Sequence, residues 1–217
     1  MSKSISDLIR EALNSDNPTQ WFEKVYARAS EDDQKPPWAY MQVAPDLAEW
    51  AESVSLSGEG KKAIVVGCGM GDDAAFLADC GFKVTAFDIS PTAIELCKKR
   101  FADKDNLHFQ PADLLKTPAE WRGAFDFVLE NRTVQSIPTQ MAEDSIQAIA
   151  SFVAPDGKLL VLCKGRDPAA PARGIPWGLS TTELQSFLNA GLTQQQFDDK
   201  KSGDARRFRV LYHRPTT

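Results

Sequence analysis

Glycines and acids recur in one stretch of the sequence at a spacing that suits the binding of a nucleotide-type ligand. Three glycines follow the apolar run 63–66 at alternating positions: Gly67, Gly69 and Gly71. Because glycine lacks a Cβ atom, its backbone can turn tightly and approach a ligand. Segment 72–79 has a helical composition, so its free N–H groups would face the glycine turn. The next apolar run, 83–88, ends in the carboxylate of Asp88, which completes the plan of a nucleotide-type cofactor site.

The strict dinucleotide-binding pattern is not met, because Asp72 stands where that pattern requires a third glycine. For the glycines alone, a plain strand-to-helix turn stays an alternative. Polar groups at successive strand ends favour a ligand site. Asp88 could accept hydrogen bonds from both hydroxyls of a ribose, and Asp113, after the next predicted strand, could meet an adenine amine. In open α/β sheets, ligands bind at the edge where the parallel strands end.

Predicted strands and helices alternate from residue 61 onward, which indicates an α/β fold. The strands are predicted at 62–66, 83–88, 107–110, 125–130, 158–163, 192–198 and 206–213. Helices are predicted at 72–80, 91–101, 139–153 and 180–190, the last opening on the capping-box pair Ser180 and Glu183. We therefore predict a Rossmann-like, mostly parallel seven-stranded sheet with helices on both faces and an antiparallel last strand.

The first part of the chain has a different pattern. Residues 1–20 place apolar side chains on one helical face, residues 21–26 are aromatic with helical spacing, and residues 41–53 read as a further helix. We predict that residues 1–60 form an N-terminal helical arm or lid and that residues 61–217 form the main domain.

Composition and charge narrow the functional classes. The chain of 217 residues has a net charge of −5, which argues against binding to nucleic acid. It contains no apolar run of about 18 residues, so we expect no membrane partner, and no His or Asp cluster has metal-ligand spacing. The four cysteines lack Cys-x-x-Cys spacing, and the N-terminus lacks a secretory apolar region. We expect a cytoplasmic monomer or dimer with reduced cysteines that acts on a small molecule.

The sequence resembles the class I S-adenosylmethionine-dependent methyltransferases over about residues 61–165. Five segments carry the resemblance in the right order: 65–71, 87–93, 112–115, 125–130 and 155–160. Many members have an acid two residues before the first glycine, where this chain has Val65. In that respect, the chain is similar to the thiopurine, thiol and halide methyltransferases. Four further segments share this similarity: 67–73, 174–180 and the tryptophan segments 21–26 and 36–38.

The resemblance implies S-adenosylmethionine as the cofactor. The residues that it assigns to cofactor binding are Trp38, Gly67, Cys68, Gly69, Gly71, Asp73, Asp88, Ile89, Ala112, Asp113, Leu114 and Glu130. The glycines would pass under the methionine portion, Asp88 would hold the ribose, and Asp113 with Leu114 would bound the adenine. Plainer alternatives are a helix cap for Asp88 and a polar loop acid for Asp113. Asp73 would either meet the ligand's ammonium group or only favour the helix N-terminus.

The resemblance also points to residues on the acceptor side. Glu130 and Arg132 end the predicted strand 125–130 and are the candidate catalytic residues. The candidate substrate-binding residues are Trp21, Tyr26, Gln135 and Trp177. Aromatic faces attract a cationic sulfonium by about 0.5–2 kcal/mol. The alternatives are a solvated strand-end acid for Glu130 and core positions for the tryptophans.

A histidine base is not evident, because the chain has two histidines, His108 and His213, in predicted strands. This pattern fits a nucleophile that is already anionic or soft, such as a thiolate, selenide or halide, attacking by in-line displacement. Catalysis would then rest on proximity and exclusion of water. Alternatives are O- or N-methylation with Glu130 as base, or a catalytically inactive S-adenosylmethionine-binding module. The missing third glycine disfavours an NAD-type oxidoreductase.

Overall fold

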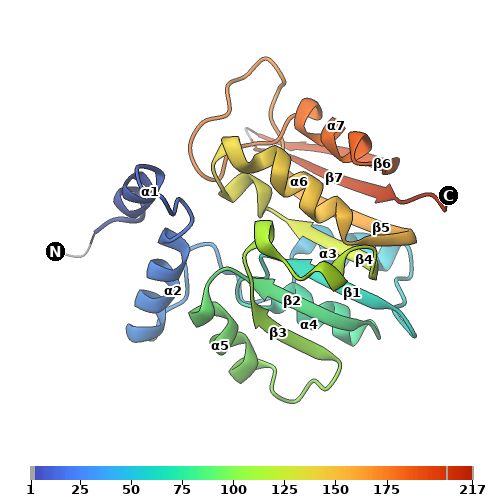
Figure 1. Cartoon of the computed structure of the whole chain (residues 1–217), viewed down its shortest axis with the longest axis horizontal. Coiled ribbons are helices and arrows are strands. Elements are labelled where there is room, and N and C mark those ends of the chain that lie inside the picture. Colours follow the sequence, from blue (N-terminus) through green and yellow to red (C-terminus); the bar gives the residue numbers. More distant parts are fainter. Residues whose placement is uncertain (1–2, 204, 217) are drawn as a thin grey trace.

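A seven-stranded sheet forms the centre of the computed structural model, which describes residues 3–203 and 205–216 (Figure 1). The strands are β1 (Lys62–Val66), β2 (Lys83–Asp88), β3 (Leu107–Pro111), β4 (Phe125–Asn131), β5 (Val153–Lys164), β6 (Thr193–Ser202) and β7 (Ala205–His213). Their order is β3-β2-β1-β4-β5-β7-β6. The first five strands of that order are parallel, and β7 runs antiparallel to both β5 and β6. The predicted Rossmann-like sheet with an antiparallel last strand is confirmed.

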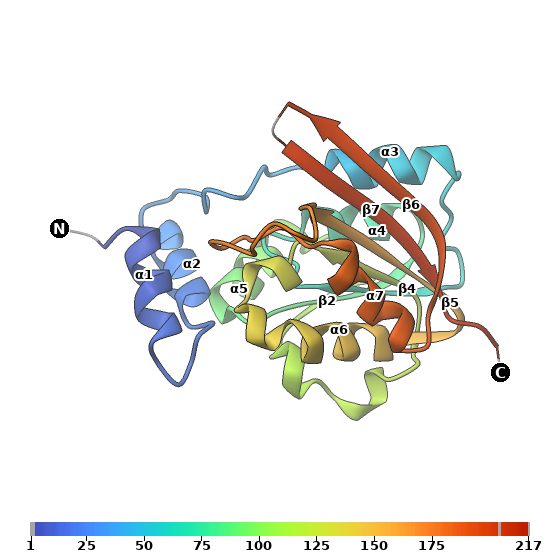
Figure 2. The same cartoon turned by 90° about the horizontal axis from the view of Figure 1, so that it is seen from above.

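Helices cover both faces of the sheet because the side chains of the inner strands are apolar on both sides. The helices are α1 (Ile5–Leu13), α2 (Trp21–Glu31), α3 (Pro45–Ser53), α4 (Asp72–Asp79), α5 (Pro91–Arg100), α6 (Ala142–Ser151) and α7 (Thr181–Asn189). Ile64 and Val66 of β1 join one core with α6 and α7, whereas Ala63 and Val65 join the opposite core with α3 and α4. Figure 2 shows α3 and α6 on opposite sides of the sheet.

Among the element boundaries that differ from the prediction, three have a clear local reason. β5 begins at Val153, before the predicted 158, because Val153 already pairs with Phe125 and a register shift absorbs the turn that follows. The helix predicted from 139 begins at Ala142, after a single 3₁₀ turn. The helix predicted from 41 begins at Pro45, because proline favours the first helical position.

Helices α1 and α2 lie beyond the carboxyl ends of the parallel strands (Figure 1). They pack on each other through a small apolar core to which Ile175, from the loop after β5, also contributes: Leu8, Ala12, Trp21 and Val25. Segment 32–44 then connects α2 to α3 along the molecule (Figure 2). In contrast to α1 and α2, α3 belongs to the main core, where Trp50 stacks on Phe127 with a centroid distance of 5.6 Å. Residues 3–44 are called the arm below.

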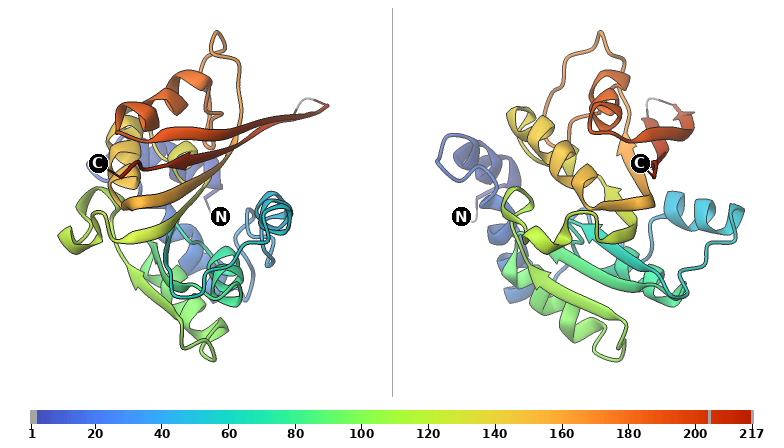
Figure 3. Two further views of the ribbon diagram at one scale, coloured as in Figure 1. Left: turned by 90° about the vertical axis from the view of Figure 1, so that its right-hand side faces the viewer. Right: turned by 45° about the vertical axis from the view of Figure 1, so that its right-hand side comes forward.

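The hairpin of β6 and β7 extends past the rest of the sheet (Figure 3). It is attached to α3 by an ion pair between Lys200 and Glu49 with an N–O distance of 2.6 Å. All four cysteines are free, as expected. Among the described residues, no helix combines the length and apolarity needed to cross a bilayer.

Candidate functional site

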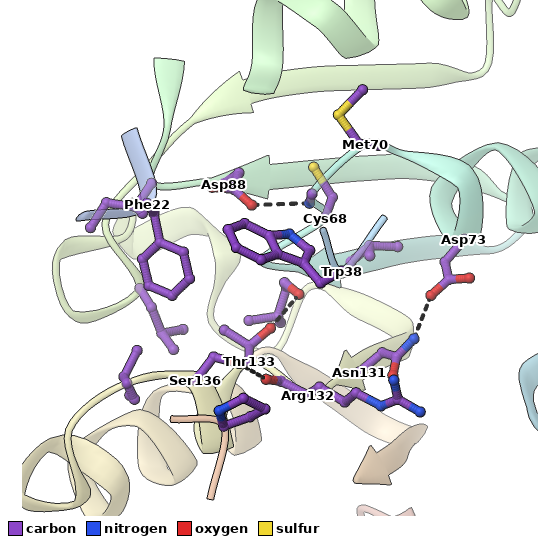
Figure 4. A pocket seen from close by; sticks show the side chains of 18 of the residues that line it. Phe22, Trp38, Cys68, Met70, Asp73, Asp88, Asn131, Arg132, Thr133 and Ser136 are labelled. Carbon is purple, nitrogen blue, oxygen red and sulfur yellow. Dashed lines mark hydrogen bonds between the residues drawn. The ribbon is translucent and has the colours of Figure 1, made fainter. Parts of the chain in front are cut away.

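A cavity of about 580 Å³ lies at the carboxyl ends of β1, β2 and β4 and is covered by the arm (Figure 4). It brings together most of the residues that the sequence predicts for the site: Trp21, Tyr26, Trp38, Gly67, Cys68, Gly69, Asp73, Asp88, Ile89, Ala112, Asp113, Leu114 and Arg132. Four predicted residues do not line it: Gly71, Glu130, Gln135 and Trp177.

The turn after β1 needs glycine at two positions that line the cavity. Gly67 and Gly69 both have φ of +57°, in the left-handed region that favours glycine. A Cβ atom at Gly67 would lie 2.5 Å from Oγ1 of Thr133, which donates a hydrogen bond to the carbonyl of Val66. A Cβ atom at Gly69 would lie 3.2 Å from the hydroxyl oxygen of Tyr26. Close contacts from β4 and from the arm therefore converge on this turn.

Gly71 has a different function from the other two glycines. It is the N-cap of α4, and a Cβ atom there would lie 2.9 Å from the ring of Phe109 and 3.0 Å from Sγ of Cys97. Its contacts are with the core behind the cavity wall, so packing and a φ of +84° account for this glycine.

Asp88, at the end of β2, is a buried carboxylate that also faces the cavity. Its Oδ2 accepts a hydrogen bond from the Gly69 N–H at 3.0 Å, and its Oδ1 accepts one from the Ser90 N–H at 2.9 Å. Burial raises the pKa of Asp88, and these hydrogen bonds counteract the rise. A carboxylate oxygen has a second lone pair, so each can still accept a hydrogen bond from a ligand hydroxyl.

Asp73 connects three segments that surround the cavity. Its Oδ1 accepts a hydrogen bond from the Ala44 N–H at 2.8 Å, and its Oδ2 accepts one from the side-chain amide of Asn131 at 2.7 Å (Figure 4). Burial raises its pKa. Asp73 therefore fixes the root of the arm and the end of β4 to the start of α4, a role that neither sequence alternative included.

Apolar groups and one half-exposed acid form the end of the cavity next to β3. Ile89 and Ala112 line it together with Leu114 and Asp113. The Asp113 side chain is 38% exposed, and its Oδ1 accepts a hydrogen bond from the Leu115 N–H at 2.9 Å. The other carboxylate oxygen, Oδ2, lies 3.7 Å from Nζ of the exposed Lys116, so both oxygens have local partners.

Four aromatic side chains of the arm, called the aromatic wall below, close the cavity on one side: Trp21, Phe22, Tyr26 and Trp38. The Trp38 ring meets Trp21 and Tyr26 edge to face, each at a centroid distance of 5.7 Å. Its indole N–H donates to the Tyr26 hydroxyl at 3.2 Å. Trp21 is buried, and its indole nitrogen has no hydrogen-bond partner among the described residues. Figure 4 shows the Phe22 and Trp38 rings projecting into the cavity.

A carboxylate of α2 holds the aromatic wall against the main domain. Glu23 accepts hydrogen bonds from the hydroxyls of Ser90 and Thr92, both at 2.5 Å, and from the Thr92 N–H at 3.2 Å. Ser90 and Thr92 belong to the first turn of α5, where a negative charge is also favoured by the helix dipole. Burial alone would raise the pKa of Glu23, but these hydrogen bonds outweigh it and lower the pKa.

Arg132 follows β4 and lines the cavity with a backbone φ of +65°. Its carbonyl accepts a hydrogen bond from the Ser136 hydroxyl at 2.7 Å, which holds this turn. Within the described residues, its guanidinium forms no ion pair. The cavity therefore has a cation available at the end of β4.

Three predicted residues lie behind the cavity wall. Glu130 is fully buried, and its Oε1 accepts hydrogen bonds from the Thr133 and Val134 N–H groups at 2.7 and 3.0 Å. Strand alternation explains this, because Glu130 points to the opposite face from Asn131. Burial raises the pKa of Glu130 to about 7. The side-chain oxygen of Gln135 accepts a hydrogen bond from the Lys164 N–H at 2.7 Å.

Trp177 is the third of these residues and is 1% exposed. Its indole N–H donates to the Ile137 carbonyl at 2.8 Å. Of the two sequence alternatives for Trp177, substrate wall and core aromatic, the contacts fit the core aromatic.

Sequence reasoning missed four residues that line the cavity between β4 and the loop after β5, the apolar Ile137, Met141 and Ile175 and the polar Ser145. They come from short 3₁₀ turns, one buried helix position and a loop, none of which has a periodic pattern. The Ser145 hydroxyl is buried and has no hydrogen-bond partner in the described chain.

The chemistry of the cavity fits S-adenosylmethionine. Asp88 offers acceptors for a ribose, and the carboxylates suit a ligand that carries ammonium and sulfonium cations. Two orphaned buried groups, the Trp21 indole nitrogen and the Ser145 hydroxyl, offer polar contacts to a ligand. No group of three His, Cys, Asp or Glu residues in segments 3–203 and 205–216 is arranged to hold a metal ion.

Comparisons with known proteins agree with this chemistry. Residues 63–157 match the family model described as a methyltransferase domain. The chain is 25% identical to a 2-heptyl-1-hydroxyquinolin-4(1H)-one methyltransferase from Mycobacteroides abscessus, over 87% of this chain and 78% of that one. It is 26% identical to the probable thiol methyltransferase 2 of Arabidopsis thaliana, over 86% and 78%.

The fold is also that of solved methyltransferases. One example is magnesium protoporphyrin IX methyltransferase from Synechocystis PCC 6803 with bound S-adenosylhomocysteine (SAH), at 17% identity and a TM-score of 0.62. The similarity covers 96% of this chain and 94% of that one. The matched domain and the methyltransferases to which the chain is similar, in agreement with the sheet and the cavity, identify the protein as an S-adenosylmethionine-dependent methyltransferase.

Proposed function

We propose that the protein methylates an acidic heteroatom of a small apolar or aromatic acceptor, and that this heteroatom is a thiol or selenol sulfur or selenium. S-adenosylmethionine supplies an electrophilic methyl group when it is bound. The observation that carries the proposal is the composition of the acceptor half of the cavity, where aromatic and apolar walls stand beside Arg132, an exposed and unpaired cation, and where neither a histidine nor Glu130 lines the cavity.

The cofactor half would be built from the glycine turn and the ends of β2 and β3. Asp88 would hold the ribose through the free lone pairs of its oxygens. Ile89 and Leu114 would cover the adenine, with Asp113 at its polar edge. Gly67 and Gly69 would let the methionine portion lie against the backbone.

The way in which the acceptor must lose its proton supports a thiol as the methyl acceptor. Glu130, the sequence nominee for a base, is buried behind the wall and holds two backbone N–H groups. Neither histidine lines the cavity. The acceptor would therefore have to ionise before it reacts, which a thiol of pKa about 8.5 does more readily than a phenol of pKa about 10. Arg132 would draw the anion into place, and the aromatic wall would exclude water from it.

A halide is a weaker candidate than a thiol for this cavity, because it offers no surface for the aromatic wall and the apolar residues to cover. An acidic hydroxyl is the second candidate. It is supported by the similarity to a methyltransferase whose named substrate is a hydroxyquinolinone. Both acceptors share an anionic heteroatom on an apolar body.

We also propose that the arm acts as a lid on the domain formed by residues 61–217, and that the protein works in the cytoplasm as a monomer or dimer. Four free cysteines and a net charge of −5 support a reducing compartment and a small-molecule partner, not nucleic acid.

The test is a screen of benzenethiol, an aromatic selenol, iodide, phenols, amines and carboxylates, with SAH formation as the readout. A series of substituted thiols separates the mechanisms. If no base is used, the apparent pKa in kcat/KM follows the pKa of each acceptor, whereas an enzymatic base gives one constant pKa. Methylation confined to amines or carboxylates would overturn the proposal. SAH binding without turnover of any acceptor would favour a non-catalytic binding module.

A further inference from the structure

A second cavity of about 460 Å³ opens beside the first and is called the side groove below. Three segments far apart in the sequence form it: the end of α1 with the turn after it, residues 137–141, and the loop after β5. Its apolar surface includes Leu13 and Pro18 from the first segment and Ala172 from the loop, and the buried ring of Trp177 lies at its base.

No charged side chain lines the side groove. Its polar side chains, Ser15, Thr139 and Gln140, are all exposed, so they stand at the rim. Leu13 is 46% exposed at the end of α1, although leucine gains free energy when it is covered. A groove with these properties suits an uncharged apolar chain and disfavours a peptide or nucleotide, whose polar groups would lose water without gaining partners.

The side groove adjoins the main cavity. Ile137, Met141 and Ile175 line both cavities. A residue that faces two cavities lies between them or on their common rim. Met141 is half-buried, and its unbranched thioether side chain adapts its shape easily, so it can accommodate a chain that passes from one cavity to the other.

We propose that the side groove binds an alkyl tail of the methyl acceptor. The acceptor class is then a ring with an acidic heteroatom that carries an unbranched chain of several carbons. The ring lies between the aromatic wall and Arg132, and the tail runs past Met141 toward Leu13. This inference rests on the proposed function for the location of the acceptor, but the groove itself does not depend on which heteroatom is methylated.

The expected effect of the tail follows from the area that it removes from water. Each covered methylene raises the affinity by about three- to fourfold until the groove is filled. The probes are benzenethiol and 4-alkylbenzenethiols with chains of two to seven carbons. Their dissociation constants are measured by calorimetry in the presence of SAH, so that the readout does not require turnover.

Two variants probe the groove at different points. Leu13→Glu places a charge on the apolar surface, and Ala172→Phe fills the groove with a ring. The matched control is Val54→Glu, because Val54 is also 46% exposed, also stands at the end of a helix, and lines neither cavity. Thermal unfolding and SAH binding verify that each variant folds.

The readout is the affinity for 4-heptylbenzenethiol divided by that for benzenethiol. This ratio is expected to fall at least fivefold in Leu13→Glu and in Ala172→Phe, and to stay at the wild-type value in Val54→Glu. The proposal is overturned if the affinity does not rise with chain length, or if the ratio stays at the wild-type value in both groove variants. Chain-length dependence of binding without methylation of any probe or of the matching 4-alkylphenols counts against the proposed function and leaves the groove intact.

Discussion

Glu23 of the arm accepts a hydrogen bond from the Thr92 hydroxyl at 2.5 Å and thereby joins α2 to the first turn of α5. The same carboxylate also accepts a hydrogen bond from the hydroxyl of Ser90, two residues beyond Asp88, which faces the cavity. Glu23 thus helps to hold the aromatic wall over the cavity, which makes this contact a sensitive place to perturb the arm.

We predict that Glu23→Ala weakens SAH binding about tenfold, because hydrogen bonds to a charged acceptor are worth about 1.5–3 kcal/mol and their loss frees the arm. Calorimetry gives the affinity, and stopped-flow fluorescence of the arm tryptophans gives the dissociation rate, which should rise. The control is Glu31→Ala, at the exposed end of the same helix. Equal affinities of the Glu23 and Glu31 variants would show that the arm does not retain the cofactor.

Asp88 and Asp113 should differ in their contribution to cofactor binding. Asp88→Ala is expected to lower SAH affinity about 10- to 100-fold, since a buried acceptor of two ribose hydroxyls is lost. Asp113→Ala should lower SAH affinity only a few fold, because the Asp113 side chain is 38% exposed. Calorimetry on both variants, with circular dichroism to verify the fold, measures the difference. A larger loss in the Asp113 variant would mean that the cofactor is oriented differently.

Arg132→Gly tests the acceptor site in a variant whose fold should be unchanged. Glycine adopts a φ of +65° without steric strain, so we expect the free energy of unfolding of this variant to lie within about 1 kcal/mol of the wild-type value. The KM for an anionic acceptor should rise about tenfold, because the cation is lost, while SAH affinity stays constant. Steady-state kinetics and calorimetry measure these quantities, with Arg173→Gly, in the exposed loop, as the control. An unchanged KM would remove Arg132 from the acceptor site.

Glu130→Gln should change how stability depends on pH. Burial raises the pKa of Glu130 from 4.5 to about 7, so the folded state binds this proton more tightly than the unfolded state does. The contribution of Glu130 to the free energy of unfolding is therefore fully present below pH 4.5 and is lost as the pH rises to 7. Between pH 5 and pH 8, the free energy of unfolding of the wild type should fall by about 2–3 kcal/mol more than that of Glu130→Gln.

Urea unfolding at the two pH values measures this difference. Glu143 provides the control, because it is exposed and its pKa is lowered, chiefly by the Ser186 hydroxyl. Glu143→Gln should therefore not reduce the loss of stability between pH 5 and pH 8. A parallel pH dependence of Glu130→Gln and the wild type would show that Glu130 does not titrate in this range.

The fold was predictable because its signals are local. The bounds of β1 and β2 match the prediction, and the capping box of Ser180 and Glu183 is present as expected. Apolar runs, glycines and caps each act within a few residues, so a single sequence carries them. The same reasoning brought Gly67, Asp88 and Asp113 to one cavity, because parallel strand ends meet at one edge of the sheet.

The remaining parts of the site depend on contacts that no local pattern encodes. Glu130 and Asn131 are neighbours in sequence, yet only Asn131 reaches the cavity, because direction alternates along a strand. Trp177 could be recognised as a core residue only once its indole was seen to bind Ile137. Asp73 finds its partner in the backbone of Ala44, which has no sequence signature.

The contacts that hold the arm in place have a consequence for the synthesis of the protein. Glu23 and Thr92 are 69 residues apart, and Ile175, which completes the core of the arm, is made later still. The aromatic wall thus leaves the ribosome well before the surfaces that cover it. Until those surfaces have been made, nascent chains expose the side of the arm that later faces the cavity, which favours premature association between chains.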